Sequence, residues 1–383
     1  MPDIVIFSFF SGVGILDLAF EKNGYNIVFV NEYNTCFRRA YEFSRNSLQI
    51  KKPRLGYSAK SALAYTKGKN KQKLIRFIQE EKAAGNIVGF IGGPPCPDFS
   101  IGGKNKGASG KNGRLTKTYF DLIVRCRPDF FLFENVKGLV KTNKHKKFYN
   151  EMKMKVTHSG YVISDKIVNA LSYGVPQFRE RIIMVGFCEN DFRKSGVLPA
   201  DERNYFCFPW EKYKQFDTEK VLGLNWPEAE EFEENSKREF IYDVPESLTV
   251  EYWFRKNHVT QHPNQNRIFA VKKGLEKMKR IAEGDTKRKS FKRLHRWKYS
   301  PTAAYGNNEV HLHPYKIRRL SVAEAMAIQT LPETFILPND LTLTAMFKMI
   351  GNGVPYLMAG CIAKTLKELV KQVYDVQEEE NGT

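Results

Sequence analysis

The sequence predicts an α/β fold: a mostly parallel sheet covered by helices on both faces, with a second, smaller domain inserted into it. Short, continuous apolar runs alternate with helical patterns over the first half of the chain. This alternation stops near residue 190, and helical patterns return after residue 315. Continuous apolar strands are typical of parallel sheets buried on both faces, because each strand needs apolar side chains on both sides.

The first strand is predicted at residues 3–10, DIVIFSFF, and a helix follows at 14–24. In that helix the apolar residues recur at helical spacing on one side, and Gly24 is the expected stop. Further strands are predicted at 26–32, 86–93, 129–136 and 180–187.

The composition indicates a two-domain protein with a polyanionic partner. The chain has 383 residues, 42% of them hydrophobic, and a formal net charge of +19. Such a surplus points to nucleic acid or an anionic membrane. The apolar run at residues 4–16 is too short to span a bilayer, which takes about 20 residues, and no basic residue precedes it as in a signal peptide. The six cysteines lack C-x-x-C pairing. This usage indicates a reducing, cytoplasmic compartment and no metal site.

The inserted domain is predicted at residues 190–314, and the flanking segments 1–189 and 315–383 form the first domain. Within the insertion, residues 267–298 hold 13 Lys and Arg against three Asp and Glu. Apolar residues at helical spacing from Ile268 to Ala282 predict a basic helix that ends at Gly284.

Two features at predicted strand ends indicate an adenosine-containing cofactor. Ligands of parallel sheets bind at the carboxyl ends of the strands. The stretch FSGVG, residues 10–14, follows the first strand, and its glycines allow close backbone approach. Glu32 ends the second strand, where a carboxylate can accept hydrogen bonds from a ribose. Taken alone, the G-x-G pattern also fits a structural turn.

Two reactive side chains are predicted at the same edge. Cys96 lies in IGGPPCPDFS, where prolines fix its direction, although a lone cysteine can also be a small buried hydrophobe. Glu134 follows four apolar residues in FLFENV, and burial would raise its pKa, although a helix-capping carboxylate is the alternative. Arg179 and Arg181 in QFRER alternate along a strand, so both point to one side and suit an anion or a base edge, or a salt-bridged strand end.

In this order, these motifs resemble the DNA cytosine carbon-5 methyltransferase family, prokaryotic restriction-modification type, nearly from end to end. FSGVG is similar to its first motif, GGPPCPDFS to the nucleophile motif, ENV to the sixth and QFRER to the eighth. RRLSVAEAMAIQTLPETF and GNGVP are similar to the ninth and tenth. The resemblance implies a Rossmann-like S-adenosylmethionine-dependent methyltransferase domain with an inserted target-recognition domain.

The resemblance also implies roles for individual residues. Cys96 would attack carbon 6 of a flipped-out cytosine, and Glu134 would hold and protonate ring nitrogen 3. Arg179 would contact the base's carbonyl oxygen, and Arg181 would buttress the site. The implied S-adenosylmethionine pocket, which would release S-adenosylhomocysteine, is lined by Phe10, Gly12, Val13, Gly14, Ile15, Glu32, Tyr33, Gly93, Pro95, Asn352 and Val354.

The implied partner is double-stranded DNA, bound by a monomer that protects DNA from a restriction endonuclease in a bacterial or phage-infected cell. Residues 101–118 would form a loop that closes over DNA, with phosphate contacts from Lys104, Lys106, Lys111 and Arg114. The alternatives are a tRNA cytosine-5 methyltransferase and an inactive DNA-binding homologue. The sequence departs from the family pattern at Ser8, Ile15 and Pro97, and the adenine-contacting acidic residue is not found.

Overall fold

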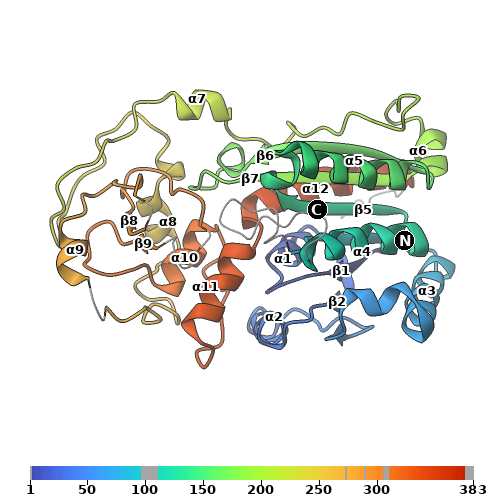
Figure 1. The fold of residues 1–383 in the computed structure, drawn as a ribbon, viewed down its shortest axis with the longest axis horizontal. Coiled ribbons are helices and arrows are strands. Elements are labelled where there is room, and N and C mark those ends of the chain that lie inside the picture. Colours follow the sequence, from blue (N-terminus) through green and yellow to red (C-terminus); the bar gives the residue numbers. More distant parts are fainter. Residues whose placement is uncertain are drawn as a thin grey trace, which may run out of the picture.

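The computed structural model describes residues 2–95, 111–271, 274–288, 290–303, 305 and 310–375. The fold has two lobes, and the larger one is a seven-stranded sheet with helices on both faces (Figure 1). The strand order is β3-β2-β1-β4-β5-β7-β6, parallel from β3 to β5, with β7 antiparallel to both of its neighbours. The predicted α/β fold class is therefore confirmed. The strands are β1 (Ile4–Phe9), β2 (Asn26–Asn31), β3 (Tyr57–Ser58), β4 (Ile87–Gly92), β5 (Phe130–Val136), β6 (Tyr161–Asn169) and β7 (Glu180–Cys188).

The continuous apolar strands divide their side chains between two cores. Along β1, Ile4 and Ile6 pack into a core with α1 and α12, whereas Val5 and Phe7 pack into the core under α3, α4 and α5. This alternation is the two-residue period of a strand with both faces covered. The helices of this lobe are α1 (Ile15–Lys22), α2 (Thr35–Ser47), α3 (Gly68–Ala83), α4 (Lys111–Cys126), α5 (Asn143–Thr157), α6 (Glu189–Ser195) and α12 (Tyr356–Val373), with 3-10 turns at Ala62–Thr66, Lys137–Val140 and Ala170–Tyr173.

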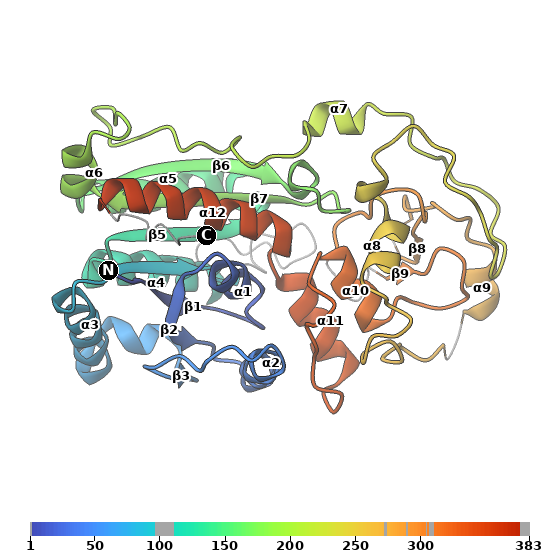
Figure 2. The ribbon, with the colours of Figure 1, turned by 180° about the vertical axis from the view of Figure 1, so that it is seen from behind.

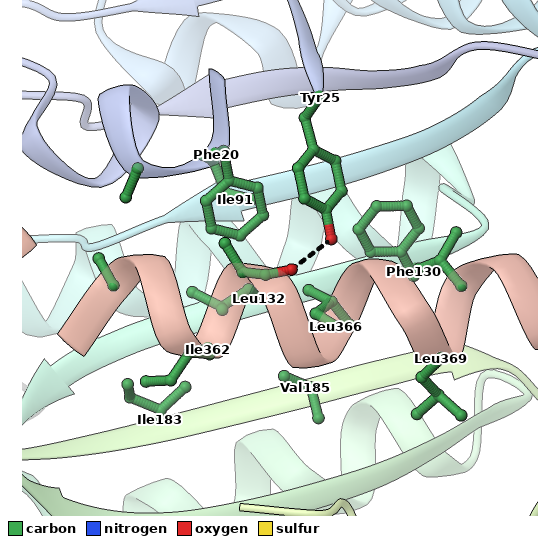
Figure 3. Packing of buried hydrophobic residues seen from close by; sticks show 14 of the residues in the cluster. Phe20, Tyr25, Ile91, Phe130, Leu132, Ile183, Val185, Ile362, Leu366 and Leu369 are labelled. Atoms are coloured by element: carbon green, nitrogen blue, oxygen red, sulfur yellow. Dashed lines mark hydrogen bonds between the residues drawn. The ribbon is translucent and has the colours of Figure 1, made fainter. Parts of the chain in front are cut away.

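Helix α12, from the far end of the chain, covers the sheet face opposite α4 and α5 (Figure 2). Figure 3 shows Phe20 of α1 and Leu132 of β5 beside Leu366 of α12. The Tyr25 hydroxyl donates a hydrogen bond to the Ala363 carbonyl at 3.0 Å. The C-terminal segment is thus built into the core of the first lobe.

The second lobe contains short elements, and the predicted basic helix from residue 268 to 284 is wrong. Only α9 (Leu275–Lys279) forms in the described part of that stretch. The buried guanidinium of Arg293 donates to the carbonyls of Met278 at 2.7 Å and Ile281 at 2.8 Å, which a continuing helix would use. The lobe's other elements are α7 (Thr218–Leu222), a 3-10 turn at Glu246–Leu248, α8 (Val250–Lys256), β8 (Lys292–Arg293), β9 (His311–Leu312), α10 (Val322–Ile328) and α11 (Leu343–Asn352).

The chain passes between the two lobes at other points than residues 190 and 314. Phe206, Phe208 and Trp210 pack into the same core as α12, so the chain stays on the sheet well past β7. Ala323 and Ala327 of α10 pack against the apolar side chains of α8 in the second lobe. Within the described ranges, each helix is too short or too polar to cross a membrane.

Candidate active site

Several of the predicted site residues that the structure describes lie at the carboxyl edge of the sheet, where β1, β2, β4 and β5 end. Residues 10–14 follow β1, Glu32 follows β2, Gly93 follows β4, and Glu134 lies near the end of β5. The neighbours of β1 are β2 on one side and β4 on the other, so the strand order reverses here. Such a reversal opens a crevice at which α/β proteins bind ligands.

The loop after β1 turns sharply through left-handed backbone conformations. Phe10, Gly12 and Gly14 have φ angles of 55°, 60° and 77°. A Cβ atom on Gly14 would overlap the ring of Tyr41, so glycine is required there on two counts. Beside Gly12, by contrast, an added Cβ would meet nothing within 4 Å among the described residues. The loop therefore presents open backbone at the N-terminus of α1, a favourable place for a ligand.

Glu32 is tied to this loop through both of its carboxylate oxygens. The Gly12 N–H donates to Oε2 at 2.8 Å, and the Asn34 N–H donates to Oε1 at 2.6 Å. Burial raises the pKa of Glu32, and the two N–H bonds oppose that shift. Each oxygen keeps a further lone pair for an external donor.

Two neighbours of these groups complete the polar and aromatic surface. Tyr33 is 72% exposed, so its ring is free to contact a ligand. The Ser11 hydroxyl is buried and has no hydrogen-bond partner in the described structure. Sequence reasoning missed Ser11, whose only signal is its place inside FSGVG.

The carboxyl group of Glu134 is buried at the end of β5 and faces Gly93. A methyl group on Gly93 would lie 2.7 Å from Glu134 Oε2, so glycine leaves the space that the carboxyl group occupies. Burial raises the pKa of Glu134, and the nearby guanidinium groups of Arg181 and Arg179 oppose the shift. The predicted burial of Glu134 is confirmed.

The two arginines of QFRER have different partners. Arg181 lies opposite Val136 in the β5–β7 pairing, and its Nε lies 2.8 Å from Glu134 Oε1. Arg179 is fully buried, and its Nη2 donates to the carbonyls of Gly351 at 2.8 Å and Gly353 at 2.9 Å. Arg181 therefore orients the carboxyl group, and Arg179 fastens the turn between α11 and α12.

That turn brings the GNGVP stretch against the loop that follows β1, residues 10–14. A Cβ on Gly353 would overlap the Ile15 side chain at the start of α1. Val354 is buried and Asn352 is exposed beside it. Val13 and Ile15 are buried against α10 and α11, so they support the loop by packing.

Two buried glutamines that sequence reasoning missed hold the same turn. Gln329 Nε2 donates to the Ile350 carbonyl at 2.8 Å, and Gln177 Nε2 donates to Gln329 Oε1 at 3.3 Å. Their signal in the sequence is weak: each is an amide next to an apolar or proline-containing stretch.

Several predicted residues fall outside this geometry. Cys96, Lys104 and Lys106 lie outside the described residues. Pro95 is exposed at the last described position, and the carbonyl of Pro94 accepts a hydrogen bond from Asn135 Nδ2 at 3.3 Å. The predicted loop at 101–118 is wrong for residues 111–118, because these residues form the start of α4. Thr116 and Thr118, in this part of the helix, are buried.

Comparison with known proteins decides the family. The sequence profile of the C-5 cytosine-specific DNA methylases matches residues 4–368. The chain belongs to this family. It is a DNA (cytosine-5-)-methyltransferase, and the family implies S-adenosylmethionine as methyl donor. The predicted family and enzyme class are confirmed.

Bacterial relatives align over nearly the whole methyltransferase. The chain is 51% identical over 372 residues to the Type II methyltransferase M.NmeDI of Neisseria meningitidis serogroup C, covering 97% of this chain and 85% of the relative. It is 28% identical to the Type II methyltransferase M.FnuDI of Fusobacterium nucleatum, covering 98% and 97%.

Solved structures agree on the fold. A putative DNA modification methyltransferase encoded within an E. coli prophage superposes with a TM-score of 0.65 at 22% identity, covering 96% of this chain and all of that one. The Entamoeba histolytica methyltransferase EhMeth superposes with a TM-score of 0.55 at 14% identity, covering 99% and 100%. At these identities the likeness supports the fold alone.

Proposed function

We propose that this enzyme methylates carbon 5 of a flipped-out cytosine within a specific double-stranded DNA sequence, through a covalent adduct with Cys96. The observation that carries the proposal is the buried Glu134 carboxyl group, held by Arg181 and faced by Gly93. Gly93 directly follows β4, and in the sequence it is followed by Pro94, Pro95 and Cys96. The sequence thus places the nucleophile three residues from the contact with Glu134.

In the proposed reaction, Glu134 acts on the cytosine ring. Its raised pKa makes the protonated form easier to reach than in an exposed glutamate, and that form can donate a hydrogen bond or a proton to ring nitrogen 3. Protonation there makes carbon 6 a better acceptor, so the Cys96 thiolate forms a bond with carbon 6 and leaves carbon 5 electron-rich. After carbon 5 gains the methyl group and loses its proton, the bond between sulfur and carbon 6 breaks.

The geometry favours exchanging the roles first expected for the two arginines. Arg181 lies on the same carboxyl group that would hold the base, so we assign contact with the base's carbonyl oxygen to Arg181. Arg179 is fully buried and bonded to backbone carbonyls, so we assign it the buttressing role. A guanidinium group suits either task, because its donors diverge in a fixed plane.

The residues at the carboxyl edge fit S-adenosylmethionine. The open backbone beside Gly12, the unpartnered Ser11 hydroxyl and the free lone pairs of Glu32 match the polar groups of a nucleoside with an amino-acid tail. S-adenosylmethionine supplies an electrophilic methyl group on sulfur. The residues that would hold it are Phe10, Gly12, Val13, Gly14, Ile15, Glu32, Tyr33, Gly93, Pro95, Asn352 and Val354, with Ser11 added.

We assign DNA reading to the second lobe. Since residues up to Trp210 pack on the sheet, we place the start of this domain near residue 217 and include α10 with it. A stacked base is out of reach of the chemistry, so the enzyme must flip it out. By analogy with M.NmeDI, we propose a monomeric modification enzyme of a restriction-modification system, working beside an endonuclease in the cytoplasm.

The test uses S-adenosylmethionine with a labelled methyl group, random-sequence duplex DNA and, in parallel, tRNA. We expect label in DNA only, at cytosines of one sequence, and its complete loss in Cys96→Ser. The matched control is Cys207→Ser, which changes an exposed cysteine in a loop. Label in tRNA alone would favour the tRNA enzyme. Wild-type protein that binds DNA but transfers no label would favour the inactive homologue.

A further inference from the structure

A buried, charged cluster lies beneath the proposed cofactor loop, residues 10–14, and takes no part in the reaction described above. It joins Asp17 and Glu21 of α1 to Tyr41 and Arg45 of α2. Arg45 Nε lies 2.8 Å from Glu21 Oε2, and the Tyr41 hydroxyl donates to Asp17 Oδ2 at 3.0 Å. The Arg45 side chain is only 1% exposed. Burying a guanidinium group so completely is costly unless carboxylates and hydrogen-bond acceptors lie around it.

One of those donors reaches the cofactor loop itself. Arg45 Nη2 donates to the Gly14 carbonyl at 2.6 Å. The same carbonyl accepts the Leu18 N–H at 2.9 Å, the first hydrogen bond of α1. Arg45 therefore fixes the peptide at which the loop ends and the helix begins.

Shape reinforces this contact. The guanidinium group of Arg45 stacks over the Tyr41 ring, 4.2 Å from its centre. A Cβ on Gly14 would overlap the Tyr41 ring and lie 2.7 Å from Arg45 Nη2, so the two side chains fill the space under the loop. The left-handed conformation of Gly14 is thus held from below by α2.

We propose that Arg45 is a positioning residue for the S-adenosylmethionine site, which it serves by fixing the Gly14 carbonyl and with it the turn at residues 12–14. The inference rests on the proposed role of this loop in binding the cofactor. Arg45 does not line the open side of the loop at Gly12, so its effect on the cofactor is transmitted through the backbone.

The charges of the cluster show why stability and positioning must be measured separately. Burial raises the pKa of Glu21 to about 7 and also raises the pKa of Asp17, while Arg45 opposes both shifts. Removing Arg45 would leave two buried carboxyl groups without their cation, and that loss destabilises a protein whatever the loop does. A second change, Glu21→Gln, removes one of those carboxylates.

The experiment measures S-adenosylhomocysteine binding by calorimetry, steady-state kinetics, and DNA binding without cofactor. For Arg45→Met we expect the cofactor Kd and the KM for S-adenosylmethionine to rise about tenfold, with kcat and DNA affinity within about twofold of wild type. Arg45→Lys should recover part of the affinity. Arg45→Met/Glu21→Gln should regain thermal stability without regaining cofactor affinity. The control is Arg76→Met, which breaks an exposed ion pair with Glu80 on α3.

Unchanged cofactor affinity in folded Arg45→Met would overturn the inference. So would recovery of affinity together with stability in the double variant, because the role would then be structural only. Failure of the wild-type protein to bind S-adenosylhomocysteine would overturn the proposed cofactor site, and this inference with it.

Discussion

Gly93→Ala should lower activity strongly while leaving the fold intact. The added methyl group would lie 2.7 Å from Glu134 Oε2, whereas ordinary contacts begin at 3.4 Å, so the carboxyl group must move by about 0.7 Å. Arg181 holds that group at 2.8 Å, so the movement breaks or lengthens the ion pair. Displacements of about 1 Å at a reacting group can cost about 100-fold in rate. We therefore expect a fall in kcat of roughly 10- to 100-fold.

The assay is methyl transfer to DNA at saturating substrates, with thermal unfolding in parallel. The matched control is Gly89→Ala in β4, the strand that Gly93 follows, where a methyl group would overlap Phe130 and lie 2.7 Å from Ile6 Cδ1 in the core. That variant should lose about 1–3 kcal/mol of stability through overpacking, yet keep the activity of its folded fraction. Full activity in Gly93→Ala would refute the reasoning, because Glu134 would then tolerate displacement.

Further expectations concern the base pocket and the second lobe. Glu134→Gln should lower kcat at least about 100-fold with DNA affinity retained. In the wild type, kcat should fall as the pH rises through the raised pKa of Glu134, since the reaction needs its protonated form; a flat pH–rate profile over that range would count against this. Arg296→Met should destabilise the fold by about 3–5 kcal/mol in thermal unfolding, because it leaves Glu283 buried and unpaired, whereas a loss below about 1 kcal/mol would contradict that. Reversing the exposed cations of residues 267–298 should flatten the dependence of DNA affinity on salt by about 0.9 per lost phosphate contact, and an unchanged slope would remove them from the interface. The cations to reverse are Lys277, Arg280 and Lys287, with buried Arg293 left untouched.

Most strands of the first lobe could be predicted because two features of the sequence indicate them: an apolar run and the type of residue that follows it. A strand covered on both faces is apolar at every position, and a strand end in this fold is followed by glycine or by a polar group. β1 and β5 show both signals. β6 was missed because it lies at the sheet edge, where the polar residues Ser164, Asp165 and Lys166 interrupt the apolar run. The two-residue β3 gives too little sequence to recognise.

The basic stretch of the second lobe shows where periodicity fails. Met278 and Ile281 are buried, as a helix would bury them, but they pack around Arg293, and their carbonyls bind its guanidinium group. Charge counts treated this arginine as surface. Its burial follows from contacts with residues up to 23 positions away, including the Lys316 carbonyl, which no local pattern reports.

The position of the site at the carboxyl edge of the sheet could be predicted, but the separate roles of its two arginines could not. Glu134 and Glu32 were found because their strands end at one edge of a parallel sheet. Arg179 and Arg181 are two positions apart, so the sequence predicts that both point to the same side of a strand and gives no reason to distinguish their roles. They differ only because the turn at Gly351 and Gly353 closes over Arg179. That turn comes about 170 residues later, so its effect is invisible to local reasoning.

The burial of α12 against α1 also governs when this protein becomes active during its synthesis. The Tyr25 hydroxyl can form its hydrogen bond only after Ala363, 338 residues downstream, has been synthesised. Gly353, in the turn that packs on Ile15, is also synthesised near the end of the chain. Contacts at such separation form last, after the cost of closing a very long loop. A chain that ends before residue 350 therefore lacks the helix that covers α1 and the turn that packs on Ile15 beside the loop at residues 10–14. Translation thus sets the order of events: the proposed methyl-donor site gains its last wall only after the segment to which we assign DNA reading has emerged.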